Sequence, residues 1–237
     1  SQSSITRIGR QQLLTKEFAA ERAALIELGQ ALVNDEFPAD QEHLSTVGNT
    51  AQVSVVDRWG NAVSLTHTLG RFYGNKFANP SLGCPYHSLL EGVSNPKARS
   101  SIPTSMCPTI VVRDGEVLLV LGSGASNRIP GIVATVISNV VDRKLDLGGA
   151  VLAPRVLWGP YKGFSYYAEI FRSITEEQVN ELGTFGYEPI YRVRPPVRLS
   201  LFSRTGSVNA VHLDRETRVL NGVGDPRRNG TALGASF

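Results

Sequence analysis

Two threonines, Thr50 and Thr68, lie at the open end of a predicted β-hairpin, where their hydroxyl groups could take part in nucleophilic chemistry. The segments 51–57 and 61–68 alternate apolar and polar residues, and residues 58–60 (Arg-Trp-Gly) separate them. Short alternating segments on either side of a glycine-containing turn are typical of a β-hairpin. The pattern therefore predicts that two hydroxyl side chains, distant in sequence, lie close together.

The position of the turn sets the expected register of this hairpin. We expect Asp57 to pair with Ala62, which places Thr50 opposite Leu69. Thr68 is then one residue from the position opposite Thr50, and adjacent strands lie about 4.8 Å apart. At that separation, neighbouring side chains on paired strands can interact. The register thus predicts contact between the two threonines without help from another element.

A threonine hydroxyl is a weak nucleophile unless a base removes its proton. One solution is the threonine's own α-amine, which becomes available when the preceding peptide bond is broken. Attack of the Thr50 hydroxyl on the Asn49 carbonyl would break that bond, and Gly48 gives the backbone freedom to approach it. The freed amine has a reference pKa of about 8, so part of it is neutral at physiological pH. The alternative is that Thr50 simply begins a strand.

Two further stretches carry candidate binding groups. Residues 119–129 (LVLGSGASNRI) indicate a strand, a Gly/Ser turn and the start of a helix, and such a turn presents backbone N–H groups to an anion or an oxyanion. The stretch lacks the lysine of GxxxxGK[ST] and is not a clean GxGxxG, so nucleotide binding has little support. Residues 103–109 (PTSMCPT) place two hydroxyls, those of Thr104 and Ser105, ahead of a strand. The alternative for them is an ordinary capped turn.

The elements that must position these residues occur in blocks rather than in strict alternation, which predicts an α+β fold. Apolar residues at helical spacing predict a helix within 13–33, and the polar residues 34–48 indicate a connecting segment. Residues 70–105 have no clear period, and such long irregular stretches are often functional. The remaining expected elements are a hairpin at 108–113 and 117–121, helices at 130–141, 146–152 and 175–182, and a β pair at 207–213 and 217–223.

Composition argues against several classes of function. The 237 residues include 24 basic and 21 acidic ones, for a net charge of +3, and the basic residues form no long run, so a nucleic-acid-binding stripe is not expected. Two cysteines and four scattered histidines, without a metal-binding motif, support neither a zinc site nor a disulfide framework. No apolar run has the length of a membrane span. The compartment stays open, with the cytoplasm slightly favoured over export.

Five segments, in this order, resemble the small subunit of the γ-glutamyltransferase family, also called γ-glutamyltranspeptidases. They are TAQVSVVDRWGNAVSLTHTL, PTSMCPTIVVRDGE, LGSGASNRI, LDLGGAVLAPRV and GSVNAVHLDRETRVLNGVGDPRRNGTALG. The resemblance runs from about Gly48 to the C-terminus, and residues 13–33 are similar to the end of the family's large subunit. It implies two regions: a large-subunit-like end with a processing linker at 1–49, and a small-subunit-like catalytic region at 50–237.

The resemblance implies an N-terminal-nucleophile hydrolase with a four-layer αββα sandwich, completed by a large-subunit chain in a heterodimer or heterotetramer. Members are made as precursors that cut themselves before a threonine, which implies processing between Asn49 and Thr50. Thr50 would be the nucleophile and Thr68 the helper threonine beside it. The implied substrate is a small amide or γ-glutamyl-like molecule. No cofactor, metal, nucleic acid or membrane span is implied.

The resemblance also assigns substrate-contacting groups. Thr104 and Ser105 match a serine pair that binds the substrate's carboxylate. Ala125 and Ser126 match two glycines whose backbone N–H groups form the oxyanion hole. A backbone donor survives a change of side chain, so this role can persist.

Departures from the family pattern fall where the transferases hold the glutamyl head group. Gly70 stands in place of an asparagine. Residues 83–92 (GCPYHSLLEG) replace GILLNNxMDDF, so that Leu89 and Gly92 occupy the positions of a glutamine and an aspartate that hold the substrate's amine, with Glu91 adjacent. Gly70 and Glu91 are therefore candidates for an altered substrate contact.

We expect an amide or acyl hydrolase with a threonine nucleophile, acting through an acyl-enzyme on a substrate other than a plain γ-glutamyl donor. One alternative is a conventional γ-glutamyl transferase or glutathione hydrolase. Another is an unprocessed, non-catalytic subunit. Retention of Thr50 and Thr68 favours an enzyme, whereas the altered head-group loop favours the silent subunit.

Overall fold

The structure is a computed structural model, and it describes residues 14–24, 50–71, 73–92, 104–159, 163–167, 175–184, 190–192 and 206–234. Helices and strands occur in blocks in this part of the chain, as expected for an α+β fold. The predicted connecting segment and Asn49 lie outside the described residues. Of the helix expected within 13–33, the described part is α1 (Lys16–Ala24).

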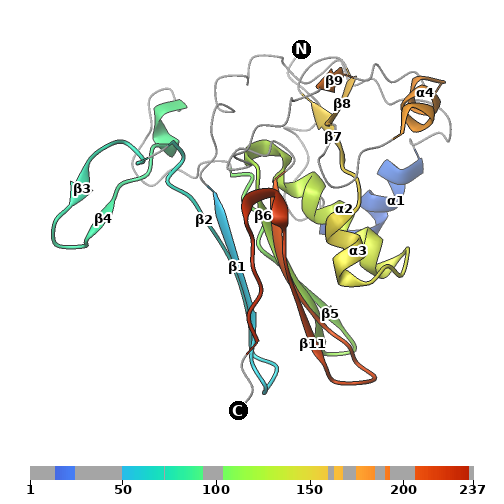
Figure 1. Cartoon of the computed structure of the whole chain (residues 1–237), viewed down its shortest axis with the longest axis horizontal. Helices are drawn as coiled ribbons and strands as arrows, with labels where there is room; N and C mark the ends of the chain where they lie inside the picture. Colours follow the sequence, from blue (N-terminus) through green and yellow to red (C-terminus); the bar gives the residue numbers. More distant parts are fainter. Residues whose placement is uncertain are drawn as a thin grey trace.

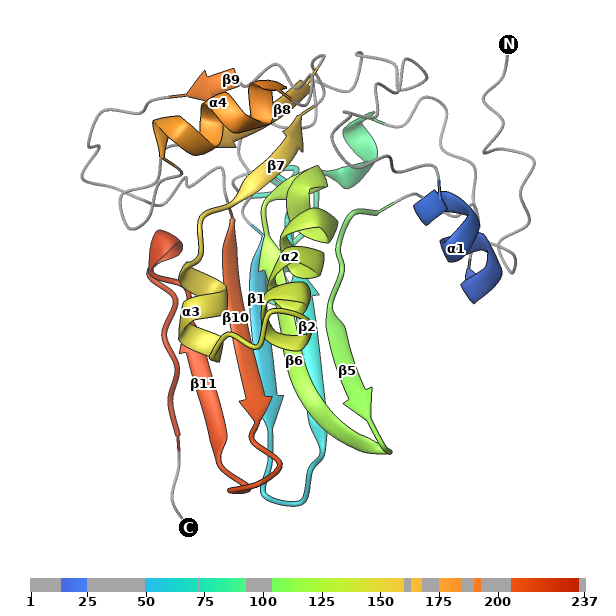
Figure 2. The ribbon, with the colours of Figure 1, turned by 90° about the vertical axis from the view of Figure 1, so that its right-hand side faces the viewer.

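A four-stranded antiparallel sheet forms the centre of the described structure (Figure 2). Its strands run in the order β11 (Leu220–Gly224), β10 (Ser207–Leu213), β6 (Glu116–Gly124) and β5 (Thr109–Arg113). Strand β6 is rich in consecutive apolar residues because it is buried along most of its length. The prediction that this strand ends at residue 121 and a turn begins at 122 is wrong, because β10 pairs with β6 as far as Gly124.

Helices cover one face of this sheet. In Figure 1, α2 (Ile129–Val141) and α3 (Leu147–Leu152) lie side by side along it. The apolar side chains of α2 recur at helical spacing and pack against β6, which makes a core of Leu119, Leu121, Ile129, Ile132, Val133, Val136 and their neighbours. Asp146 precedes α3 and caps it, because its side chain accepts the N–H of Gly149 at 2.7 Å.

The predicted N-terminal hairpin forms, and it lies on the opposite face of the sheet. Strand β1 (Ala51–Val56) pairs with β2 (Ala62–His67), and Figure 1 shows this pair, the four-stranded sheet and the helices as successive layers. The expected pairing of Asp57 with Ala62 is wrong by one residue, because Val56 pairs with Ala62. Asp57 belongs to the turn instead, where its carboxylate accepts the N–H groups of Trp59 and Asn61, each at 2.9 Å.

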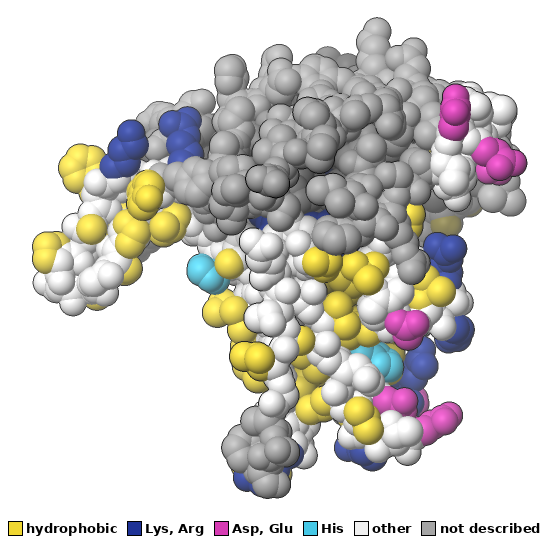
Figure 3. All heavy atoms as spheres, in the orientation of Figure 1, with side chains coloured by type: hydrophobic (Ala, Val, Ile, Leu, Met, Phe, Trp, Pro, Cys, Tyr) yellow, Lys and Arg dark blue, Asp and Glu magenta, His cyan; other side chains and the backbone are white. Residues whose placement is uncertain are grey.

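The irregular stretch after β2 forms an arm. It contains β3 (Ala78–Asn79), β4 (Cys84–Pro85) and the short helix η4 (Leu89–Gly92). The arm projects from the layers in Figure 1, and Figure 3 shows hydrophobic side chains along it. Tyr73 and Phe77 are both more than 70% exposed, which is unusual for aromatic residues of one short segment.

A second sheet lies in the part of the chain between α3 and β10. It consists of β7 (Val156–Gly159), β8 (Gly163–Tyr167) and β9 (Ile190–Arg192), none of which is among the expected elements. Helix α4 (Glu176–Thr184) matches the helix expected at 175–182. The last β pair also forms, but its second strand begins at Leu220 rather than at 217, because Asp214 accepts the N–H groups of Glu216 and Thr217 and extends the turn.

Candidate active site

The hydroxyl groups of Thr50 and Thr68 are in direct contact. Thr50 immediately precedes β1 and Thr68 immediately follows β2, and the pairing of Ala51 with His67 places the two threonines opposite each other. Thr50 Oγ1 donates a hydrogen bond to Thr68 Oγ1 at 3.1 Å, and the N–H of Gly70 donates to the same oxygen at 2.9 Å. The prediction that these two threonines are neighbours is confirmed, although the register differs by one residue.

The end of β6 lies against the backbone of Thr50. Gly124 has no side chain, and a Cβ there would overlap the carbonyl oxygen of Thr50. The Nη1 atom of Arg228 lies 3.2 Å from that same Cβ position. Glycine is therefore needed for the close approach of a strand from each sheet. This approach brings the turn that follows β6 next to Thr50.

That turn contains Ala125 and Ser126, the residues expected to form an oxyanion hole. Ala125 is buried, and Ser126 begins the short helix η5 (Ser126–Arg128) with a φ of 57°. A left-handed conformation costs a non-glycine residue roughly 1–2 kcal/mol, and such residues are concentrated at functional sites. Turns of this kind can direct successive N–H groups at an anion. The turn thus lies next to Thr50, and its expected role as an oxyanion hole stays a prediction.

Thr104 and Ser105 lie in the loop that leads into β5. Thr104 is exposed, and its hydroxyl accepts the N–H of Met106 at 3.1 Å, which is the capped turn that the sequence left as an alternative. Ser105 is half-buried. The same loop is tied to the hairpin where the N–H of Thr109 donates to Ser64 Oγ at 3.1 Å. A substrate-binding role for the two hydroxyls stays a prediction.

Gly70 turns the chain from the two threonines into the arm. Its φ is +79°, and a Cβ there would meet the Ser88 hydroxyl oxygen at 2.5 Å, so a larger residue does not fit. Gly70 offers no side chain to a substrate, and its N–H is already bonded to Thr68. Glu91, the other candidate, lies in η4, and its role stays a prediction.

Ser88 is a residue near the site that the sequence did not single out. It is buried, its N–H donates to the Leu69 carbonyl at 2.8 Å, and its hydroxyl accepts the N–H of Arg71 at 2.9 Å. These bonds close the base of the arm on the residues that follow Thr68. A serine within a long polar loop has no pattern that would have predicted this.

A buried carboxylate, that of Asp225, organises the same end of the neighbouring strands, where Ser207 of β10 pairs with Gly124. It precedes the short helix η7 (Pro226–Arg228) and accepts Arg155 Nη2 at 2.8 Å, the N–H of Val208 at 3.1 Å and the N–H of Arg227 at 3.0 Å. Both arginines also donate to the Val151 carbonyl near the C-terminal end of α3, where cations are favoured. The sequence marks this cluster only as the GDPRR turn after the last β pair.

Arg228 contributes positive charge on the Gly124 side of Thr50. Burial lowers the pKa of its guanidinium; the carboxylate of Asp225 raises that pKa, and the charge of Arg128 lowers it. Arginine nevertheless stays protonated at physiological pH. Two arginines, one of them in η5, therefore lie near the turn expected to stabilise an oxyanion.

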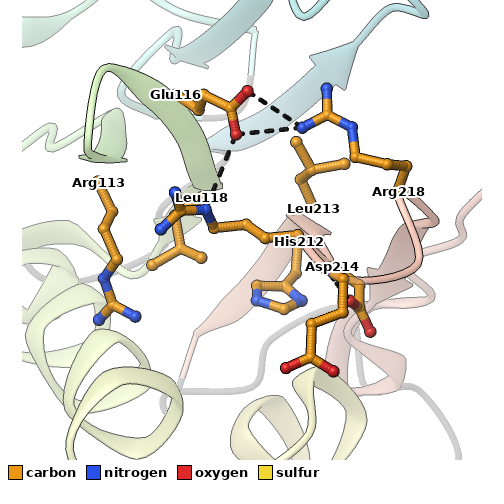
Figure 4. Close-up of a pocket in the computed structure, with 9 residues that line it drawn as sticks. Arg113, Glu116, Leu118, His212, Leu213, Asp214 and Arg218 are labelled. Atoms are coloured by element: carbon orange, nitrogen blue, oxygen red, sulfur yellow. Dashed lines mark hydrogen bonds and ion pairs between the residues drawn. The ribbon is translucent and has the colours of Figure 1, made fainter.

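A wide, open hollow lies at the far end of the sheet (Figure 4). Arg113, Glu116, Leu118, His212 and Arg218 are among its lining residues, and Arg218 donates to Glu116. Burial lowers the pKa of His212, and Asp214 opposes that shift. Eight residue steps of β6 separate Glu116 from Gly124, or roughly 26 Å at the rise of a β-strand. The hollow is therefore separate from the Thr50 region.

The described residues offer neither a metal-binding cluster nor a membrane-spanning helix. Within the described ranges, no group of three His, Cys, Asp or Glu side chains is arranged to hold a metal ion. Among the helices described, none combines the length and apolar character needed to cross a bilayer. Cys84 is exposed and Cys107 half-buried, and both are free thiols.

Comparison with known proteins gives consistent matches. The family model described as gamma-glutamyltranspeptidase matches residues 2–235. The chain is 26% identical over 199 residues to a glutathione hydrolase proenzyme of Bacillus subtilis (strain 168), covering 80% of this chain and 31% of that protein. It is 30% identical over 203 residues to the capsule biosynthesis protein CapD proenzyme of Bacillus anthracis, covering 84% of this chain and 35% of that protein.

The fold agrees with these matches. A gamma-glutamyltranspeptidase from Pseudomonas nitroreducens, solved in complex with L-DON, superposes with a TM-score of 0.64 at 27% identity, covering 78% of this chain and 99% of the matched chain. The present chain spans about a third of the length of the curated relatives described above. Since the family model covers almost every residue, the chain belongs to the gamma-glutamyltranspeptidase family, within the N-terminal-nucleophile hydrolase superfamily.

Proposed function

We propose that the protein is an amide or acyl hydrolase in which Thr50, once it is an N-terminus, is the nucleophile. The observation that carries this proposal is the contact between Thr50 and Thr68 at 3.1 Å, next to the turn that holds Ala125 and Ser126. A nucleophile, a second hydroxyl that orients it and nearby backbone donors are the parts that acyl transfer requires.

The first step in this proposal is the release of Thr50. Its Oγ attacks the carbonyl carbon of Asn49, the peptide C–N bond breaks, and the acyl group passes to the oxygen as an ester. Water hydrolyses that ester, which leaves a carboxylate on Asn49 and a free amine and hydroxyl on Thr50. The division of the chain into 1–49 and 50–237 is part of the same proposal.

The second step is turnover of a substrate amide. The Thr50 hydroxyl attacks the substrate carbonyl while the α-amine of the same residue takes its proton and passes it to the leaving amine. The backbone N–H groups of Ala125 and Ser126 bind the oxyanion that forms on the carbonyl oxygen. Water or a second amine then attacks the ester on Thr50 and releases the product. Thr68 keeps the hydroxyl in place through their hydrogen bond.

The substrate that we propose is not a plain γ-glutamyl donor. Gly70 has no room for a side chain, and Leu89 and Gly92 carry neither a carboxamide nor a carboxylate, so these three positions cannot hold a glutamyl amine as polar side chains would. Thr104 and Ser105 remain the proposed contacts for a substrate carboxylate, and Glu91, between Leu89 and Gly92 in sequence, is a further proposed contact. The competing proposal is a conventional glutathione hydrolase, which the name of the Bacillus subtilis relative favours.

We also propose a partner that covers the hairpin. The outward side chains of β1 and β2 are apolar and about half exposed, namely Val53, Val55, Val63 and Leu65. Apolar surface of this kind is favourable to bury. The relatives are more than twice as long as this chain. A large-subunit-like region packed on this face would supply the fourth layer of an αββα sandwich.

The experiment that tests the function measures the intact mass of the denatured protein and compares the wild type with Thr50→Ala. The wild type should separate into two polypeptides at the bond between Asn49 and Thr50, and Thr50→Ala should stay whole and lose nearly all amidase activity. Thr135→Ala, at a half-buried threonine of α2 whose hydroxyl donates to the Gly131 carbonyl, is the matched control and should be cleaved like the wild type. Cleavage or full activity in Thr50→Ala would refute the proposal. A wild type that stays whole and inactive with its partner region present would favour the silent subunit.

A further inference from the structure

The face of the hairpin that points at the central sheet is polar, which is unusual for a surface buried between two sheets. Its side chains form three cross-strand pairs, of which Thr50 with Thr68 is the first. Gln52 pairs with Thr66, and Ser54 pairs with Ser64. Because strand side chains alternate between faces, all six lie on the same side of the hairpin as the proposed nucleophile. We call this row the polar ladder.

Gln52 is the centre of the polar ladder. Its side chain is buried, with 5% of the residue exposed. Its Oε1 accepts the Thr66 hydroxyl at 2.5 Å, and its Nε2 lies 3.0 Å from both Ser54 Oγ and Ser64 Oγ. A Cβ on Gly122 of β6 would overlap the Gln52 carboxamide, so the glycine makes room for it.

The ladder connects the hairpin to two different strands of the central sheet. The hydroxyl of Ser54 donates to the Asn209 carbonyl of β10 at 2.8 Å, and that of Ser64 donates to the Leu121 carbonyl of β6 at 2.8 Å. Asn209 Nδ2 in turn donates to the backbone carbonyl of Gln52 at 2.7 Å. Both hydroxyls that reach the sheet are thus held by the same carboxamide.

We infer that Gln52 is a positioning residue for Thr50. Hydrogen bonds are directional, so the ladder sets how β1 lies over β6 along the strand direction as well as how far apart they are. The ends of these two strands carry Thr50 and the turn with Ala125 and Ser126. The carboxamide of Gln52 therefore fixes the distance between nucleophile and oxyanion donors without touching a substrate. This inference rests on the proposed function of Thr50.

The test compares Gln52→Met with the wild type in the complete protein. Methionine keeps the length and volume of the side chain and removes every hydrogen bond of the carboxamide. We expect the rate of cleavage before Thr50 and the kcat on an amide substrate to fall about tenfold or more, because a small misplacement of reacting groups costs up to about 100-fold. The KM should change less than about threefold, since Gln52 binds no substrate.

The matched control removes a buried carboxamide on the other side of the sheet. Asn139 of α2 is 3% exposed and its Nδ2 donates to the Ala150 carbonyl at 3.3 Å. Asn139→Leu should lower the melting temperature but leave cleavage and kcat unchanged at a temperature where the protein is folded. If Gln52→Met does not fold, Thr66→Val, which removes only the hydroxyl bonded to Gln52, should slow both reactions several-fold.

The outcomes separate the two proposals. The positioning role is supported if Gln52→Met lowers the cleavage rate and kcat while Asn139→Leu keeps the wild-type value of both. Wild-type rates in Gln52→Met and in Thr66→Val, or an equal loss in Asn139→Leu, would overturn it while leaving the role of Thr50 intact. Activity that survives Thr50→Ala would refute the proposed function and the positioning role together.

Discussion

The two faces of the central sheet are built on opposite physical principles. On the helix face, aliphatic side chains of α2 and α3 pack against those of β6 and β10. Ile132 of α2 and Val208 of β10 belong to this one core. On the hairpin face, β1 and β2 meet the same strands through hydroxyl and carboxamide groups, with Gln52 at the centre. Apolar burial is strong but non-directional, whereas hydrogen bonds are individually weak and directional. The helix face is therefore suited to stabilising the fold. The hairpin face is suited to fixing the position of β1 and β2 over the central sheet.

The largest effect should come from Asp225→Ala, at the edge of the helix face. The change leaves the guanidinium groups of Arg155 and Arg227 buried without their carboxylate. Breaking a buried ion pair in this way costs about 3–5 kcal/mol of unfolding free energy. Urea denaturation would measure it, with Asp114→Ala as the control, because its exposed pair with Arg215 should be worth less than about 1 kcal/mol. Equal losses in the two variants would contradict the burial argument.

Ile132→Ala tests whether the helix face contributes only stability. Ile132 is fully buried, and truncating such a side chain costs about 2–5 kcal/mol. We expect a lower urea midpoint with unchanged kcat per folded molecule, measured at low temperature. A fall in kcat similar to that of Gln52→Met would remove the distinction between the two faces.

Gly122→Ala and Gly131→Ala form the pair with the smallest effects, and they should differ in sign. A Cβ on Gly122 would overlap the Gln52 carboxamide on the hairpin face, which should cost about 1–3 kcal/mol. A Cβ on Gly131 of α2 meets nothing within 4 Å, so alanine should stabilise by about 0.4–1 kcal/mol through the unfolded state. Thermal unfolding of both variants checks this, and destabilisation by Gly131→Ala would show that the helix has less room than the structure indicates.

Patterns within short segments predict much of this fold. The alternation in 51–57 and 61–68, the apolar spacing of α2 and the turn residues around Gly115 all place elements within a few residues of their observed ends. The register of the first hairpin could not be predicted, because it depends on Asp57 bonding to the turn N–H groups rather than pairing with a residue of the other strand. Strands β7 to β9 have no clear alternation in sequence, although β7 and β8 pair as a short local hairpin, and β9 joins them through a parallel pairing in which Ser165 faces Ile190.

The candidate site is predictable in part for a related reason. Alternation says which side chains of a strand share a face, and so it placed Thr50 and Thr68 together. It does not say which face is buried. In β1 and β2 the buried face is the polar one, so the role of Gln52 emerges only when β6 and β10 are seen beneath it. Ser88 belongs to no local pattern. Asp225 caps the turn that follows it, but its contacts with Arg155 and Val208 join residues far apart in sequence.

The span of the bonds around Gln52 has a consequence for timing. Its own hairpin closes over 18 residues, but Ser54 and Gln52 reach Asn209 across 155 and 157 residues. Contacts of such long sequence separation form late in folding. During synthesis, Thr50 leaves the ribosome well before β10 exists. Self-cleavage that needs this arrangement must wait until β10 has been made and has paired with β6, so the proposed cut would act as a checkpoint that releases the nucleophile only in a correctly folded molecule.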